Sequence, residues 1–118
     1  MFRALAPLTP KPAEIYLRPA LKNPAVAHCR KIWERTYDRV YKLHNSITVA
    51  RLNAADAFRE ALPPLDCYEN IRDFITCVGY AMAAEIMIEG TGQELLLAAK
   101  VALTAEARCP KTQGKAES

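Results

Sequence analysis

Apolar side chains recur with helical spacing through residues 25–62, a segment that contains neither proline nor glycine. At 100° per residue, one broad face collects Cys29, Ile32, Trp33, Thr36, Val40, Leu43, Ile47, Ala50, Ala54, Phe58, Ala61 and Leu62. The pattern keeps its phase past Asn45. However, Ser46 is a good N-cap, and the β-branched run that follows it disfavours a helix interior. We therefore predict either one kinked helix or two helices, 25–44 and 47–62, with two helices favoured.

Two further helices are predicted in the second half of the chain, over about 67–88 and 92–107. The first of these carries two apolar stripes, so we expect neighbours on both sides and a central position. Between them, Gly90 suits the left-handed position that ends a helix, and Thr91 with Glu94 resembles a capping box. No segment alternates with a period of two for long enough to form a strand. The predicted fold class is all-α, a compact bundle of three or four helices.

Proline distribution divides the chain into parts. Five of the eight prolines lie in residues 1–24, where they allow at most one short helical turn and favour an extended, proline-rich N-terminal arm. Residues 110–118 are polar and are predicted to be disordered. A length of 118 residues is that of one domain. We therefore expect an arm, one helical bundle domain over residues 25–109 and a polar tail.

Charge is unevenly distributed along the chain, with eleven Lys/Arg against five Asp/Glu in residues 1–62 and five against eight in residues 63–118. Such asymmetry marks either a basic half that faces a partner or two halves of one bundle that attract each other, and we favour the second.

No apolar run approaches the ~20 residues of a membrane span. Arg3 and Pro7 interrupt the N-terminal apolar run, so a secretory signal is not expected. We expect a cytoplasmic protein without a membrane partner.

Histidines and cysteines do not form a recognisable metal or catalytic pattern. His28 and His44 stand on different faces of the same predicted helix, with no carboxylate at ligand spacing. The four cysteines match no zinc or redox spacing and are expected to be reduced thiols, although a bridge between Cys29 and Cys109 stays open. The common catalytic and phosphate-binding motifs are absent from the sequence. We therefore expect no enzymatic activity, no catalytic residues, no metal ligands and no cofactor.

Arg51 intrudes on the otherwise apolar face of the second predicted helix, and Glu85 lies at the border between the two apolar stripes of the third. A lone buried charge is strongly unfavourable, whereas a buried pair is tolerated. We therefore predict a structural ion pair between Arg51 and either Glu85 or Glu89, one helical turn further on. Acid–base chemistry by the two glutamates is the weaker alternative, because no histidine or metal accompanies them.

Aromatic and cationic residues alternate in residues 29–44, "CRKIWERTYDRVYKLH". On a helical wheel, however, they separate: Trp33 joins the apolar face and is expected to be buried. Four cations lie together on the far side, namely Lys31, Arg35, Arg39 and Lys42. Single-stranded nucleic acids need rings and cations on the same surface. A solvated face with Arg30–Glu34 and Asp38–Lys42 pairs is favoured, and the four cations remain a candidate phosphate- or partner-binding surface.

Val49 and Leu52 project away from the main apolar stripe of the second predicted helix and have no obvious partner within the bundle. They form a candidate association surface, with scattered surface aliphatics as the alternative. Small residues elsewhere in that helix permit close approach of another helix. We therefore hypothesise a small non-enzymatic interaction protein that binds another macromolecule. A protein is the favoured partner, and self-association into a homo-oligomer is a further expectation. The alternative is a nucleic-acid-binding protein that uses the basic helix face and the basic arm.

Overall fold

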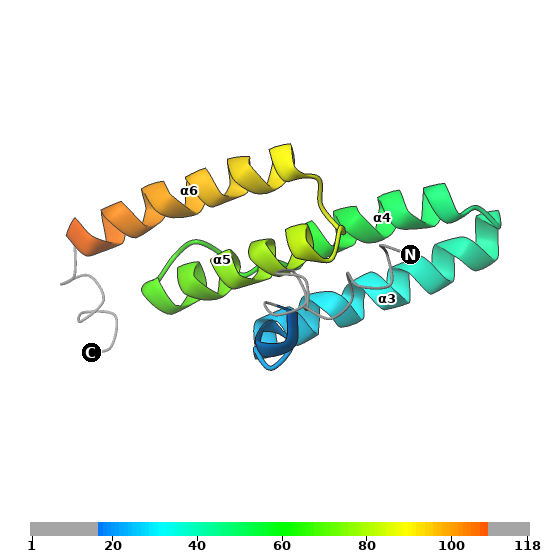
Figure 1. The fold of residues 1–118 in the computed structure, drawn as a ribbon, viewed down its shortest axis with the longest axis horizontal. Coiled ribbons are helices and arrows are strands. Elements are labelled where there is room, and N and C mark those ends of the chain that lie inside the picture. Colours follow the sequence, from blue (N-terminus) through cyan, green and yellow to red (C-terminus); the bar gives the residue numbers. More distant parts are fainter. Residues whose placement is uncertain (1–16, 109–118) are drawn as a thin grey trace, which may run out of the picture.

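The computed structural model describes residues 17–108, in which every regular element is a helix (Figure 1). A short helical segment at residues 17–20 precedes four longer helices: α3 (Pro24–His44), α4 (Ile47–Glu60), α5 (Tyr68–Ala83) and α6 (Glu89–Arg108). This confirms the predicted all-α bundle. Residues 1–16 and 109–118 lie outside the described residues, and with them most of the predicted arm, the whole predicted tail and Cys109.

Residues 25–62 form two helices, as favoured from the sequence, and the break falls at Asn45 and Ser46. Asn45 adopts the left-handed conformation with φ 52°, and its N–H donates to the Tyr41 carbonyl at 2.7 Å. Asparagine tolerates this conformation better than most residues with a Cβ. The Ser46 hydroxyl then accepts from the Val49 N–H at 3.2 Å and caps α4. α3 and α4 therefore fold back on each other as an antiparallel hairpin (Figure 1).

A second antiparallel hairpin consists of α5 and α6, joined by residues 84–88 (Figure 1). The predicted boundaries here were wrong, because α5 ends at Ala83 rather than at residue 88 and α6 begins at Glu89 rather than at residue 92. The left-handed residue is Glu85, with φ 61°, and no described glycine has a positive φ. Gly90 therefore lies inside the first turn of α6 instead of ending a helix.

Hydrogen bonds at the end of α5 explain this difference. The Ile86 N–H donates to the Ala81 carbonyl at 2.8 Å, and the Glu85 N–H donates to the Met82 carbonyl at 3.2 Å. These two bonds make a Schellman motif, which usually places glycine at the left-handed position. Gly92 has a different role, because a Cβ built there would clash with the side chain of Met82. It permits the close approach of α6 to α5.

The two hairpins meet mainly through α3 and α5, and α5 also packs along α6, so α5 has the predicted neighbours on both sides. One hydrophobic cluster joins the hairpins; it contains Ala20, Val26, Cys29, Phe58, Ile71, Phe74, Cys77, Val78, Tyr80, Ala81, Met87 and Ala99. Ala20 belongs to the segment that was predicted to be an extended arm, so the packed domain begins before residue 25. Asn23 adds a polar link, since its side chain caps α3 and donates to Asp73 of α5 at 3.2 Å.

Candidate functional site

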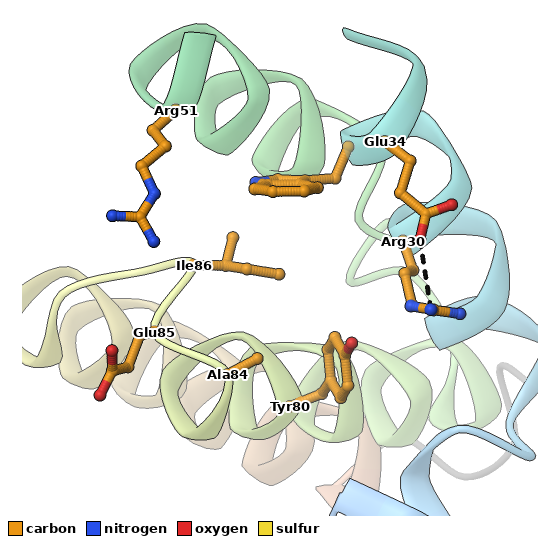
Figure 2. Close-up of a pocket in the computed structure, with 8 residues that line it drawn as sticks. Arg30, Glu34, Arg51, Tyr80, Ala84, Glu85 and Ile86 are labelled. Atoms are coloured by element: carbon orange, nitrogen blue, oxygen red, sulfur yellow. Dashed lines mark ion pairs between the residues drawn. The ribbon is translucent and has the colours of Figure 1, made fainter. Parts of the chain in front are cut away.

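A cavity of about 270 Å³ lies where the α3–α4 hairpin meets the end of α5 (Figure 2). Three elements and one turn supply its lining: α3, α4, α5 and the residues that follow α5. The lining residues are Arg30, Trp33, Glu34, Arg51, Tyr80, Ala84, Glu85 and Ile86. The cavity therefore combines aromatic and aliphatic walls with four charged side chains.

Aromatic stacking positions two residues of this lining. Trp33 stacks on Tyr37, with ring centroids 5.2 Å apart, and Tyr37 stacks in turn on Tyr41 at 6.1 Å, so the three rings form a row along α3. Tyr80 stacks on the buried ring of Phe58 of α4 at 6.3 Å. Trp33 packs against the core but is half-buried rather than buried as expected, because the cavity lies beside it.

The charges around the cavity differ from the sequence prediction. Arg30 and Glu34 form an ion pair at 3.2 Å along α3, as expected from their i,i+4 spacing. Arg51 and Glu85 do not pair, although both line the cavity; in Figure 2, Arg51 extends from α4, and the Glu85 side chain, from the turn after α5, points away from it. Both side chains are exposed, so burial does not force them together. Glu89 instead accepts a hydrogen bond from Gln93 at 3.0 Å.

The basic surface on α3 has the arrangement expected from the helical wheel. All four of its cations are exposed: Lys31, Arg35, Arg39 and Lys42. The predicted Asp38–Lys42 pair is not formed; the ion pairs within the described part of the chain are Arg30–Glu34 and Arg59–Asp56. The four cations therefore have no ion-pair partner among these residues, which leaves them available to an anionic partner.

A second hollow, an apolar groove of about 210 Å³, lies between α4 and the start of α6. Leu52 and Ile88 line it and are 63% and 74% exposed. Half-buried Val49, predicted to share a surface with Leu52, does not line this groove. Ile88 was missed because it was assigned to an apolar stripe of the helix predicted over about 67–88 and was therefore expected to pack within the bundle. The remaining lining residues are Ala55, Asp56, Arg59, Ile86, Met87 and Thr91.

Two buried thiols form a contact that the sequence spacing did not suggest. Cys29 of α3 and Cys77 of α5 have no exposed surface, and the Cys29 thiol donates to the Ala61 carbonyl at 3.4 Å. The hydrogen bond to Cys29 and burial together raise the pKa of Cys77 well above the range of a free thiol. Cys77 therefore stays protonated and unreactive in the folded protein.

Within residues 17–108, no group of three or more His, Cys, Asp and Glu side chains is arranged to hold a metal ion. No helix in this part of the chain is long and apolar enough to cross a membrane. Comparison with protein-family models, with curated proteins and with solved structures gives no match. The cavity, the apolar groove and the basic surface of α3 are therefore the candidate functional sites of the described residues.

Proposed function

We propose that this protein is a small, non-enzymatic, cytoplasmic helical interaction protein that binds a partner protein through the apolar groove. The observation that carries the proposal is the exposure of Leu52 and Ile88, two large aliphatic side chains that come from different elements and line one hollow. Single exposed aliphatics are normal on a protein surface, whereas aliphatics gathered around a concave surface are typical of interaction sites.

The surroundings of the groove support this interpretation. Buried Met87 and half-buried Ile86 contribute to its apolar lining. Asp56 and Arg59, which pair at 2.7 Å, and Thr91 provide polar groups in the same lining. An apolar centre bordered by polar groups is the usual anatomy of a protein interface. A partner helix that inserts aliphatic side chains fits this surface, and a second copy of the chain is an alternative occupant.

Affinity capture from the native host with matched variants tests this proposal. Leu52→Glu and Ile88→Glu each place a charge in the groove, so we expect both to lose the same captured protein with a loss of affinity of about tenfold or more. Thr48→Glu introduces the same charge at an exposed position of α4 that does not line the groove, and it should retain that protein. If both groove variants retain every protein that the wild type captures, the proposal is wrong.

Self-association through the same groove has a separate readout. Light scattering over a range of concentrations reports the mass of the wild-type chain, and Leu52→Glu should lower that mass if a second copy occupies the groove. If the wild-type chain has the mass of a monomer at all concentrations, a second copy does not occupy the groove, and the expected occupant is a different protein.

Nucleic-acid binding is the alternative function, and the specific observation in its favour is that the four exposed cations of α3 have no ion-pair partner among the described residues. Against it, Tyr37 is the middle ring of the row and is already stacked on both Trp33 and Tyr41, which leaves few free ring faces for bases. A salt titration with mixed-sequence DNA and RNA tests this function, since neutralising several phosphates gives a steep salt dependence. No binding at low salt would exclude it.

A further inference from the structure

We propose that the basic surface of α3, formed by Lys31, Arg35, Arg39 and Lys42, binds the phosphate backbone of a double-stranded nucleic acid without reading its sequence. The basic surface and the apolar groove share no residue, so this second binding function does not depend on the partner protein proposed for the groove. Nucleic-acid binding, the alternative function, is thereby narrowed to duplexes.

Helix geometry places the four cations of the basic surface one after another along α3. They are separated by four, four and three residues within a single uninterrupted helix. At 1.5 Å per residue, their Cα atoms therefore follow one another at about 4.5–6 Å and extend over about 16 Å. At 100° per residue, they share a sector of about 80° that faces away from the buried residues Val26, Cys29 and Val40. A duplex carries one phosphate about every 1.7 Å of its axis, so a surface of this length meets several phosphates at once.

No acidic side chain among the described residues neutralises these cations. All four are exposed, and none forms an ion pair with another described residue. α3 contains five Lys/Arg and two acidic residues, a net charge of +3 without its histidines. Of the two acids, Glu34 is paired with Arg30 at 3.2 Å, and Asp38 forms no ion pair with any described residue. The basic surface therefore attracts a polyanion.

The positions of the apolar side chains decide the class of polyanion. The large hydrophobic residues that α3 exposes are Tyr41 and Leu43, and each lies roughly a quarter turn or more around the helix from the middle of the basic surface. An acidic protein would need an apolar centre in its interface, and a single strand would need free rings beside the cations. Tyr37 is stacked on both of its neighbours instead. A duplex keeps its bases stacked internally and presents its phosphates, so it needs neither feature.

Fluorescence anisotropy of labelled nucleic acids with the full-length protein tests the proposal. The probes are a DNA duplex, an RNA duplex and a single strand that does not pair with itself, all of mixed sequence and equal length. We expect a duplex to bind at low salt, with a slope of log K against log salt of about −3.6, since each of four neutralised phosphates contributes about 0.9. The single strand should bind more weakly and with a shallower slope, because its phosphates release fewer counterions. Binding of either duplex supports the proposal, and the tighter one identifies the source of the phosphates.

Matched charge changes identify the surface that binds. Arg35→Gln and Lys42→Gln should each make the slope shallower by about 0.9. Arg72→Gln and Lys100→Gln remove the same charges from exposed positions of α5 and α6, and they should keep the wild-type slope. Asp38→Asn should strengthen binding, because it removes a negative charge that lies beside the cations on α3. Urea unfolding of each variant shows whether it is folded.

Unlabelled poly-L-glutamate, added as a competitor, separates a nucleic acid from an acidic protein. It should displace the labelled duplex less effectively than unlabelled duplex of the same total charge. The proposal is overturned if neither duplex binds at low salt, if the single strand or polyglutamate binds as tightly as the duplex, or if both folded α3 variants keep the wild-type slope. The groove variants Leu52→Glu and Ile88→Glu should bind the duplex as the wild type does, so a failure of either proposal is distinguishable from a failure of the other.

Discussion

The interface between the two hairpins is closed at one end and open at the other. At the closed end, Cys29 of α3 faces Cys77 of α5, and neither residue has any exposed surface. One helical turn further along α3, Trp33 lines a cavity together with Tyr80, which lies nearly one turn beyond Cys77 on α5. The same two helices thus make both ends of the interface, so the difference arises from the side chains and from what the neighbouring elements add.

Side-chain size and charge account for this difference. Thiols are small and weakly polar, and at the closed end the Cys29 thiol donates a hydrogen bond to the Ala61 carbonyl. At the open end, α4 adds Arg51 and the turn after α5 adds Glu85, and neither charge can enter a dry core without a partner. Complementary apolar faces therefore close an interface only where no unpaired charge is present.

The largest expected effect comes from truncating the same residue type in the two regions. Ile71 is 1% exposed within the hydrophobic cluster, so Ile71→Ala should lower the free energy of unfolding by about 2–5 kcal/mol. Half-buried Ile86 already borders a cavity, so Ile86→Ala should lower the free energy of unfolding by only about 1 kcal/mol. Urea denaturation measures both. Equal losses would mean that the cavity region is packed as tightly as the core.

The next effect concerns pH. Because the pKa of Cys77 is raised in the folded protein, the folded state keeps this proton at a pH where the unfolded chain has lost it. The contribution to stability is therefore complete below the unfolded pKa of about 8.5 and is lost as the pH rises, by at most about 1.4 kcal/mol per pH unit. Urea midpoints measured at alkaline pH should show a shallower decline for Cys77→Ala than for the wild type. Identical slopes would assign the decline to other groups.

A gain in stability is expected at the open end. Glu85→Gly relieves the left-handed conformation, which is unfavourable by about 1–2 kcal/mol for a residue with a Cβ. The greater freedom of glycine in the unfolded chain offsets about 0.4–1 kcal/mol of this, so a net gain of about 0.5–1 kcal/mol is expected. Urea denaturation measures the gain, with Glu85→Gln as the control that keeps the Cβ. A loss of stability in the glycine variant would show that the glutamate side chain itself stabilises the fold.

The open end also shows where prediction from sequence failed. Helical periodicity and the Ser46 cap were sufficient to place α3 and α4, because both are local signals. The end of α5 was misplaced because its apolar pattern continues through Ile88, whereas the left-handed residue is a glutamate rather than the nearby Gly90. A Schellman motif built on glutamate has no distinctive sequence signal, so the turn that completes the cavity was not found.

Contacts between distant residues were the other limit. The helical wheel correctly separated Trp33 from the cations, but it could not show that Trp33 would border a cavity rather than the centre of the core. The contact between Cys29 and Cys77 depends on how the two hairpins dock, which spacing within one helix does not reveal. For the same reason, the sequence pattern predicted an ion pair between Arg51 and Glu85, whereas the structure places both residues at the cavity without pairing them.

The smallest expected effect tests whether the paired charges of the cavity stabilise the fold. Arg30 and Glu34 are about half exposed and form an i,i+4 pair at 3.2 Å, a class of interaction worth about 0.3–0.5 kcal/mol. The order Arg before Glu is the less favourable one on a helix, so the coupling should fall at or below the lower value. A double-mutant cycle with Arg30→Gln and Glu34→Gln measures it, and raised salt should reduce it further. A coupling above about 1 kcal/mol would mean that the pair is shielded from water, and the open end would then resemble the closed end more than its exposed charges indicate.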